Sequence, residues 1–512
     1  MADERFGPRL SHDDLNRALL ARQHLADPRD ATVLDEVRHL VGLQSQVPSS
    51  PYPALWSRLA GFAPDDLGDR LLDRQVVRVA TLRGTVHLVA ADDALELTAL
   101  ARPGLATYLR SRNQHGTALA HVDLDDLERA ARDLLAEPLT SVELGRRLAE
   151  RWPDVDPKHL AYAARCLLPL VQVPPRGLWG ASGAGTTTTW TTAQAWLGRS
   201  DDALDAVAHA TDPDATLAAR VRLVRRYLAA FGPASVADAQ RWAGLTRLRA
   251  AVDVLRPELV TFTGPAGTEL LDLPAAPRPP GDEPVPVVLA GDFDNLLLSH
   301  DDRTRVLGDL PVTSVVSVNG QVAAAVLVDG RVAGAWTARR AAPAARSARA
   351  ADPGTPSARA AAPAARGARA ADPSDGTRPA DGTDVVVHVE VRPLRARSGP
   401  GAPGGEAPSL ADRLRDPAVR DAVVARPGDR GRGGWAVARA GGVGARGRRR
   451  GAARGRASPS CCGSARGGSW GSRAPRTGCG AGGRTRGRAS SSTAEASRVR
   501  PRRARCRPRG RP

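Results

Sequence analysis

Short blocks of apolar residues recur in one order over the first half of the chain, and this order constrains the fold more than any other feature. Each time, blocks with apolar residues three or four positions apart precede two strand-like blocks that flank a turn. The order occurs at residues 8–100, 121–200 and 215–275. Helices followed by a hairpin form a winged helix, so the sequence predicts three tandem winged-helix repeats.

The first repeat shows the pattern clearly. Ser11 is positioned to cap a helix whose apolar residues recur at helical spacing, and a second helix is predicted at 32–43. The other predicted elements of this repeat are helices at about 52–61 and 65–73, followed by strands at 76–82 and 85–89.

The second and third repeats also contain helix-capping residues. Thr140 or Ser141 can cap a helix at 142–151, and Ser235 can cap one at 236–243. The second repeat continues with a helix at 157–170 and a wing framed by 171–173 and Trp190. The third continues with a candidate recognition helix at 246–255 and strands at 259–262 and 270–273.

Residues 284–337 have a different pattern, because Val-rich blocks, one of them at 315–318, are separated by Asn319-Gly320 and Asp329-Gly330. Such dipeptides supply the positive φ angles of two-residue hairpins. We therefore predict a small antiparallel β domain at 284–337 and 384–425. A low-complexity insert at 338–383 interrupts it and is expected to be a flexible loop. The predicted fold class is mainly α with a small β part.

The net charge of +18 is unevenly distributed along the chain. Residues 1–340 contain 37 Lys and Arg against 43 Asp and Glu, whereas residues 341–512 contain 36 against 12. Residues 426–512 contain no Leu, Ile or Phe, so they cannot bury enough apolar surface to fold and are predicted to be disordered. Two explanations stay open: a frameshifted translation of GC-rich DNA, or a basic tail that adds sequence-independent affinity for phosphate.

Three motifs stand in a recognisable order. Gln44 and Gln46 flank Ser45 within residues 41–48, Arg83-Gly84-Thr85-Val86-His87-Leu88 follows about forty residues later, and Asp292-Phe293-Asp294-Asn295 lies near the end of the periodic part. Together they resemble the winged-helix family of DNA glycosylases that unhook bulky or crosslinked N7-alkylguanine. The resemblance covers roughly residues 8–336 and returns at 384–425. The family usually has an aliphatic residue where this chain has Ser45.

The resemblance implies that Gln44 and Gln46 are the catalytic pair. An N7-alkylated base leaves easily because its ring is already cationic, so the enzyme mainly places a water and stabilises the developing charge. Neutral amides can do this by hydrogen bonding, because each offers two donors and an acceptor. The alternative is that two glutamines at a helix end only satisfy backbone carbonyl groups.

Several basic residues are candidate DNA contacts. The resemblance places Arg83 and His87 beside the DNA cleft, where Arg83 would hold a phosphate and His87 would approach the lesion. The third repeat is rich in arginine and poor in acidic residues between 216 and 256, which favours a groove-binding face. Its candidate contacts are Arg241, Arg247 and Arg249. A solvated arginine-rich helix pair, a turn arginine and a half-buried histidine are the alternatives.

Lys158 is the only lysine of the chain, and it bears on the mechanism. A bifunctional glycosylase forms a Schiff base with an amine. Lys158 precedes a predicted helix in the second repeat and is better placed to touch a phosphate. We expect Asp294 and Asn295 to fix a turn and to order Arg303 and Arg305, since three such side chains are weak evidence for a metal.

These observations predict a monofunctional DNA glycosylase that hydrolyses the N-glycosidic bond of an alkylated or crosslinked purine in double-stranded DNA. We expect no cofactor and no metal. We also expect a cytoplasmic monomer without a membrane segment. Two alternatives stay open: a non-catalytic winged-helix DNA-binding protein or regulator, and a self-resistance protein that sequesters one toxin adduct.

Overall fold

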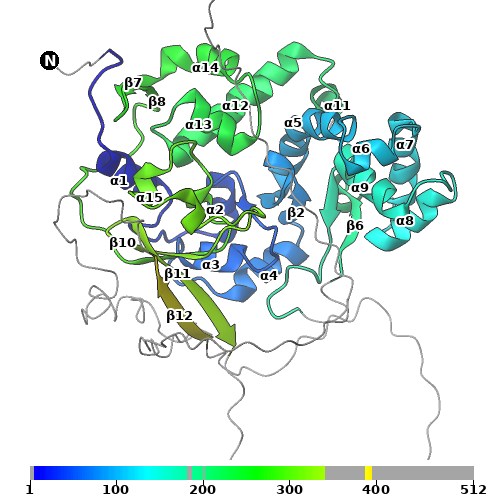
Figure 1. The fold of residues 1–512 in the computed structure, drawn as a ribbon, viewed down its shortest axis with the longest axis horizontal. Helices are drawn as coiled ribbons and strands as arrows, with labels where there is room; N and C mark the ends of the chain where they lie inside the picture. The colour runs from blue at the N-terminus through cyan, green and yellow to red at the C-terminus, as the bar shows by residue number, and fades with distance from the viewer. Residues whose placement is uncertain (1–4, 182–186, 200–201, 341–386, 395–512) are drawn as a thin grey trace, which may run out of the picture. The chain divides into compact units, whose positions relative to one another are not determined.

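The computed structural model describes residues 5–181, 187–199, 202–340 and 387–394 (Figure 1). Helices and antiparallel sheets are mixed over these ranges. Most of the predicted insert, the second part of the predicted β domain beyond Leu394, and the predicted disordered tail lie outside them. In the described part, no helix is long and apolar enough to cross a membrane.

The first segment begins with a capped helix, as predicted from Ser11. The Ser11 hydroxyl accepts a hydrogen bond from the Asp14 amide at 3.1 Å, and the Asp14 carboxylate accepts one from the Ser11 amide at 2.8 Å. The elements are α1 (His12–Arg22), α2 (Val33–His39), β1 (Leu43–Gln44), α3 (Pro51–Trp56), α4 (Pro64–Leu72), β2 (Val76–Ala80) and β3 (Val86–Ala90).

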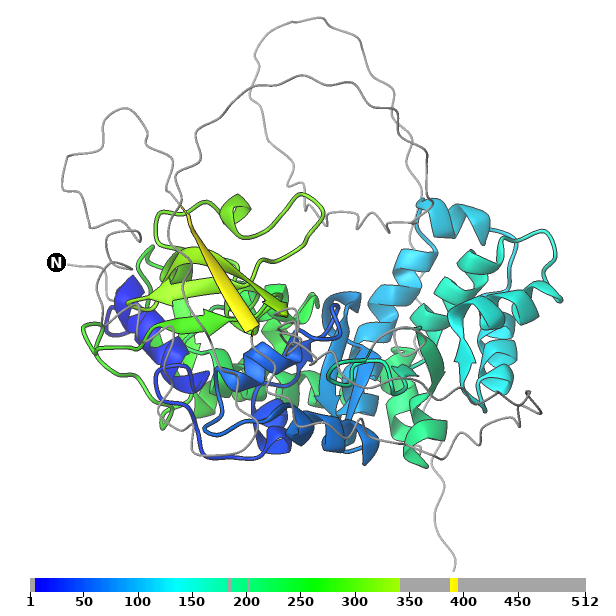
Figure 2. The ribbon, with the colours of Figure 1, turned by 90° about the horizontal axis from the view of Figure 1, so that it is seen from below.

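The long helix α5 (Ala91–Leu109), which the repeat pattern did not indicate, leads into the second segment (Figure 2). That segment comprises α6 (Gln114–Ala118), α7 (Leu124–Leu134), β4 (Leu139–Thr140), α8 (Ser141–Ala149), α9 (Pro157–Leu167), β5 (Leu170–Gln172) and β6 (Thr189–Thr192). Strands β2 and β5 pair, with Val79 opposite Val171, so the two hairpins form one six-stranded sheet in the order β1-β3-β2-β5-β6-β4.

The third segment contains helices followed by a two-stranded sheet. Its elements are α10 (Ala193–Leu197), α11 (Asp202–Ala208), α12 (Pro213–Phe231), α13 (Val236–Ala243), α14 (Arg249–Leu255), β7 (Val260–Thr263) and β8 (Glu269–Asp272). Its core is continuous with that of the first segment, because Leu19, Leu100, Tyr227 and Phe231 belong to one buried cluster.

The small β part is an antiparallel sheet in the order β12-β11-β10-β9. Its strands are β9 (Val288–Ala290), β10 (Ala325–Val328), β11 (Arg331–Arg340) and β12 (Val387–Pro393). The short helix α15 (Thr304–Leu307) lies between β9 and β10 in the sequence. Asp329 and Gly330 turn with φ of 50° and 77°, as predicted. The predicted strand at 315–318 is reduced to an isolated antiparallel bridge between Val316 and Val322 around the Asn319-Gly320 turn, and Val318 is fully exposed.

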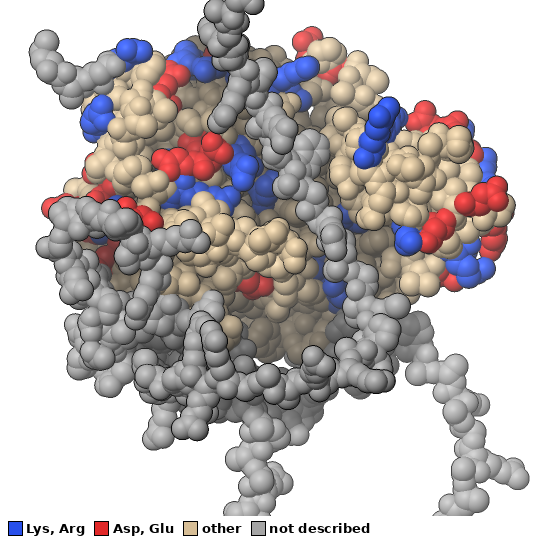
Figure 3. Space-filling view, in the orientation of Figure 1, with Lys and Arg blue, Asp and Glu red and all other residues tan. Residues whose placement is uncertain are grey.

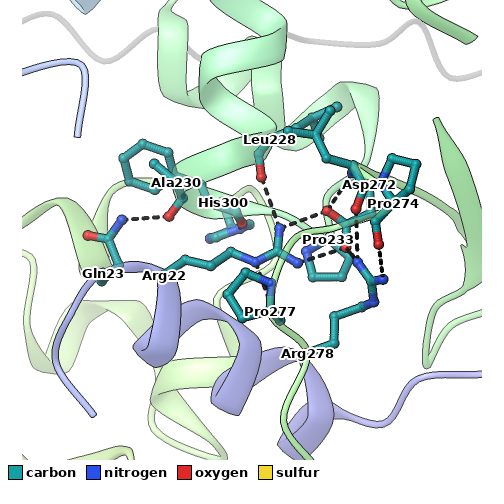
Figure 4. A network of polar contacts seen from close by, with 12 residues as sticks. Arg22, Gln23, Leu228, Ala230, Pro233, Asp272, Pro274, Pro277, Arg278 and His300 are labelled. Carbon is teal, nitrogen blue, oxygen red and sulfur yellow. Dashed lines mark hydrogen bonds and ion pairs between the residues drawn. The ribbon is translucent and has the colours of Figure 1, made fainter. Parts of the chain in front are cut away.

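A buried ion pair joins the first and third segments (Figure 4). Both nitrogens at the end of the Arg22 guanidinium donate to the Asp272 carboxylate at 2.7 Å, and both side chains are fully buried. Arg278 donates to the same carboxylate at 2.6 Å. Gln23, next to Arg22, donates to the Ala230 carbonyl at 2.7 Å. These bonds fix α1 against the end of α12 and the start of the loop after β8.

Candidate functional site

Gln44 is the last residue of the short edge strand β1, and Gln46 lies just beyond it. A sharp turn precedes this strand. After α2 the backbone passes through Val41 and Gly42, with φ of 56° and 100°. A Cβ on Gly42 would lie 2.7 Å from Cγ1 of Val89 and 2.9 Å from the Leu88 carbonyl oxygen, so glycine is required for this close approach. Strand β1 then pairs with β3, which places Gln44 opposite His87.

The third sequence motif holds both ends of this segment. The Asn295 amide donates to the Gly42 carbonyl at 2.9 Å, and the Ser50 hydroxyl donates to the Asp292 carboxylate at 2.8 Å. Burial raises the pKa of Asp292. Two motifs that lie about 250 residues apart in the sequence are therefore one structural unit.

Asp294 has a different partner from the predicted one. Its carboxylate receives two bonds from the buried Arg58 guanidinium, at 2.7 and 2.8 Å, and not from Arg303 or Arg305. It also accepts from the Leu296 amide at 2.9 Å, so the predicted turn does form. Arg305 donates instead to the Pro233 carbonyl at 3.0 Å. The expectation that this motif orders Arg303 and Arg305 is therefore corrected.

Gln44, Arg83 and His87 form one hydrogen-bonded group. Nη2 of Arg83 donates to Oε1 of Gln44 at 2.7 Å and lies 3.2 Å from Nε2 of His87. Nδ1 of His87 lies 3.0 Å from the Thr85 carbonyl oxygen, which can only accept. His87 is therefore neutral, with its proton on Nδ1 and an acceptor at Nε2.

The ionisation of this group follows from its burial. Burial and the neighbouring Arg83 cation lower the pKa of His87 to about 3, so the ring stays neutral at physiological pH. Burial, together with the guanidiniums of Arg303 and Arg241, lowers the pKa of Arg83 to about 10, which still leaves it charged. The group therefore carries one positive charge next to a neutral amide and a neutral imidazole.

Gln46 and Ser45 are held by different bonds. Oε1 of Gln46 accepts from the Val86 amide at 3.3 Å, while its side chain is exposed. Ser45 is fully buried, and its hydroxyl and carbonyl oxygens accept from the Arg78 guanidinium at 2.9 and 3.0 Å. Arg78 is itself 1% exposed, and burial, with Arg176 nearby, lowers its pKa to about 9.

Sequence reasoning did not single out Arg78, although the sequence carried a signal. Arg78 is the one charged residue in the strand Val76–Ala80, whose five residues are all buried. A charged side chain inside such a strand requires a polar partner. The hydroxyl and carbonyl of Ser45 are that partner, which accounts for a serine where the resembled family usually has an aliphatic residue.

The turn that carries Arg83 is clamped between the second and third segments. Nη1 of Arg83 donates to the Trp242 carbonyl, and Arg165 of α9 donates to the Gly84 carbonyl at 3.0 Å. Gly244 ends α13 with a φ of 68°, and a Cβ there would lie 2.7 Å from Cα of Arg83. The position of Arg83, and through it that of Gln44, thus depends on both neighbouring segments.

Much of the arginine excess in the third segment is neutralised by acidic residues, some on α5 and some in the segment itself. Arg222 pairs with Glu96 at 2.5 Å, and Arg226 pairs with Asp93 at 2.7 Å, both acids lying on α5. Within the segment, Arg225 pairs with Glu258, Arg249 lies 3.7 Å from Glu269, and Arg256 pairs with Glu269 at 2.7 Å and lies 3.9 Å from Asp253. The predicted contact Arg249 therefore has an internal partner.

Other arginines form no ion pair with a carboxylate among the described residues: Arg220, Arg241, Arg247 and Arg303, although Asp301 lies close enough to Arg303 to act on its pKa. Arg241 lies on α13, close enough to Arg83 and Arg303 to lower the pKa of each, although burial is the larger cause. Nη1 of Arg303 is buried without a hydrogen-bond partner. Figure 3 shows Lys and Arg side chains gathered along a hollow between the α13–α15 part and α5.

Two other features lie apart from this group. Lys158 lies at the start of α9 and pairs with Asp156 at 2.6 Å, and within the described ranges it forms no hydrogen bond or ion pair with Gln44 or Arg83. A cavity of about 910 Å³ beside α1 and β10 is lined by four aspartates, Asp13, Asp14, Asp282 and Asp329, and by two arginines, Arg17 and Arg331. This excess of acidic over basic side chains does not favour a polyanion such as DNA.

No cluster of three or more His, Cys, Asp or Glu side chains suited to a metal occurs among the residues with described positions. The group around Gln44 consists of amides, a neutral imidazole and guanidiniums. Such groups donate hydrogen bonds, accept them and attract anions.

The chain was compared with known families, curated proteins and solved structures. Residues 37–372 match the sequence model of the family described as DNA glycosylase AlkZ-like. The solved structure of Streptomyces sahachiroi DNA glycosylase AlkZ has a similar fold, with a TM-score of 0.53 and 20% sequence identity. The similarity covers 64% of this chain and 88% of that one. No curated protein matches.

Proposed function

Because the chain belongs to the DNA glycosylase AlkZ-like family, we propose that it hydrolyses the N-glycosidic bond of an alkylated or crosslinked purine in duplex DNA, with Gln44 and Gln46 as catalytic residues. The family confirms the predicted relationship to DNA glycosylases that act in repair. The lesion, the catalytic pair and the DNA contacts belong to the proposal.

One observation carries this proposal. One motif supplies Gln44 and Gln46, and a second motif forty residues later supplies Arg83 and His87. The pairing of β1 with β3 brings the two motifs together at one edge of the sheet. A Gln44 that only satisfied a helix end would bond to a backbone carbonyl. Its oxygen instead receives a bond from a buried cation, which is the kind of preorganisation that a catalytic amide needs.

The cations around this group supply the attraction for DNA. Arg241 and Arg303 form no ion pair in the described part of the chain, and both lie close to the Arg83 guanidinium. Phosphodiester groups would neutralise them and release counterions, which gives affinity without sequence preference. Arg220 and Arg247 would extend this surface along the third segment.

The proposed chemistry is monofunctional. A Schiff-base mechanism needs an amine beside the lesion, and the only lysine pairs with Asp156 in the second segment. Water therefore attacks the sugar carbon, and the product is an abasic site in an intact strand. No borohydride-trapped covalent complex is expected.

We interpret the three helix-and-hairpin segments as winged-helix repeats. The order β4, α8, α9, β5, β6, with β4 paired to β6, supports this interpretation for the second segment. The pairing of β1 with β3 supports it for the first. We further propose that the protein acts as a cytoplasmic monomer on double-stranded DNA, without a cofactor.

The test is incubation of the full chain with a duplex that carries a single N7-methylguanine. The expected products are free 7-methylguanine, measured by mass spectrometry, and a strand that breaks only after alkali treatment. A shifted band on a native gel without free base would instead favour the non-catalytic DNA-binding protein.

A further inference from the structure

The bonds around the two glutamines fix which end of each amide faces the protein. Oε1 of Gln44 is 2.7 Å from Nη2 of Arg83, and Oε1 of Gln46 is 3.3 Å from the Val86 amide nitrogen. A guanidinium and a backbone N–H group can only donate. The atom that faces each of them must therefore be the amide oxygen, whichever way the amide would otherwise turn.

The nitrogen ends of both amides are left without a protein partner. Among residues with described positions, no acceptor bonds to Nε2 of Gln44 or of Gln46. Gln44 is only 7% exposed, but its Nε2 atom is not one of the buried polar atoms that lack a hydrogen-bond partner. Each amide thus has two N–H donors free for a ligand.

We infer that Gln44 and Gln46 act on the substrate as hydrogen-bond donors, and that the site recognises acceptor atoms of the purine leaving group. Arg83 is the positioning residue that sets this polarity at Gln44, and the Val86 backbone sets it at Gln46. This inference rests on the proposed function and specifies which end of each glutamine performs it.

The direction of electron flow gives such donors a role. When the bond between C1′ and N9 breaks, its electron pair moves to the base, and the N7-alkylated ring changes from cation to neutral. The ring nitrogen N3 and the O6 oxygen then become stronger acceptors. Water adds its oxygen to C1′ and releases a proton to solvent. Donors aimed at N3 or O6 bind the departing base more tightly in the transition state than in the ground state.

Arg83 strengthens this effect at Gln44. A cation bonded to the amide oxygen withdraws electron density, which makes the N–H groups better donors. The same cation would oppose a role in which the Gln44 oxygen stabilises positive charge on the sugar, because that oxygen already serves the guanidinium. The geometry therefore distinguishes two roles for one residue.

The test replaces each amide nitrogen with an oxygen of nearly the same size. In the full chain, Gln44→Glu and Gln46→Glu keep the acceptor and lose the donors. Base release from the N7-methylguanine duplex in a single turnover should slow on the order of tens- to thousand-fold, as much as in Gln44→Ala and Gln46→Ala. The melting temperature of Gln44→Glu should not fall, because the new carboxylate pairs with Arg83.

Two further measurements separate this inference from the proposed function. Below pH 5, Gln46→Glu gains an O–H donor on protonation, so its rate relative to wild type should rise as the pH falls. Binding to a duplex with the uncleaved 2′-fluoro analogue needs no catalysis, and both Glu variants should lose the wild-type preference for the lesion.

Glu variants that release base as fast as wild type, or retain the lesion preference, would overturn the donor assignment while leaving the glycosylase activity intact. A wild-type protein that binds the analogue selectively but never releases base would reject the proposed function. The binding arm would still decide whether the amides act as donors.

Discussion

At the scale of single residues, Ser45 explains how a buried arginine is tolerated beside the two glutamines. Arg78 has no carboxylate partner in the described part of the chain, and its Nη1 atom is buried without a hydrogen bond. Its other nitrogens bond to Ser45 at 2.9 and 3.0 Å. An aliphatic residue at position 45 would leave a further buried donor unsatisfied, so Ser45 and Arg78 depend on each other.

We expect this dependence to appear in a double-mutant cycle. Ser45→Ala alone orphans the Arg78 Nε donor and should lower the free energy of unfolding by about 1–3 kcal/mol. Arg78→Met followed by Ser45→Ala should cost much less for the second change, because no donor remains to be satisfied. Urea denaturation of the four proteins measures the coupling. Additive losses would show that the bond has no energetic weight.

At the scale of elements, the Arg83–Gly84 turn is the joint between three segments. It connects β2 and β3, receives a bond from Arg165 of α9, and packs against Gly244 at the end of α13. Both Arg83 and Gly84 have positive φ, of 56° and 68°. The position of the proposed catalytic group thus depends on how α13 docks.

A methyl group at position 244 should disturb that docking. In Gly244→Ala the Cβ would meet Cα and N of Arg83 at 2.7 and 2.8 Å, so base release should fall at least tenfold and the melting temperature should drop. Gly320→Ala is the matched control, because Gly320 has a similar φ of 73° but nothing within 4 Å. The control should lose only the cost of a left-handed alanine, about 1–2 kcal/mol. Equal activity of the two variants would contradict the proposal that the contact between Gly244 and the Arg83–Gly84 turn positions the site.

Local signals in the sequence predicted elements well and their partners poorly. The Ser11 cap, the two strands around Arg83-Gly84 and the Asp329-Gly330 turn depend on neighbours in the chain, and all three formed as expected. The pairing of β2 with β5 joins residues about ninety positions apart, which no local pattern encodes. The 19-residue helix α5 was missed because it begins after the hairpin of the first repeat and runs past the end of that repeat, so it is not part of the helix-then-hairpin pattern.

In the candidate site, too, the residues could be predicted from the sequence more readily than their partners. The glutamines and the Arg83 motif were found from the sequence, through resemblance to a family. Arg78, Arg303 and the role of Asp294 needed the fold, because each is defined by a residue distant in sequence. The arginine count of the third repeat overstated the free charge, since acids on α5 lie against α12.

At the scale of the whole molecule, only some of the arginines in the third segment carry a positive charge that no carboxylate neutralises. Arg241 and Arg247 lack a carboxylate partner among the described residues, whereas Arg222 and Arg225 pair with Glu96 and Glu258. Surface pairs contribute little to stability but do neutralise the field at a distance. Only the unpaired arginines should therefore contribute to DNA affinity.

Salt titrations test this division of charge. The double variant Arg241→Ala, Arg247→Ala should flatten the dependence of log affinity on log salt by about one unit per lost phosphate contact. The matched variant Arg222→Ala, Arg225→Ala removes the same formal charge and should leave the slope nearly unchanged. If the two variants change the slope equally, the third segment does not bind DNA through its unpaired arginines.

The most direct test of the catalytic assignment is the single-turnover rate of 7-methylguanine release by wild type, Gln44→Ala and Gln75→Ala. Gln75 precedes β2 and bonds to Arg70 at 2.8 Å, so it controls for loss of a glutamine near the same sheet. We predict that Gln44→Ala is slower than wild type on the order of tens- to thousand-fold, while Gln75→Ala keeps the wild-type rate. Equal rates for all three proteins would contradict a catalytic role for Gln44.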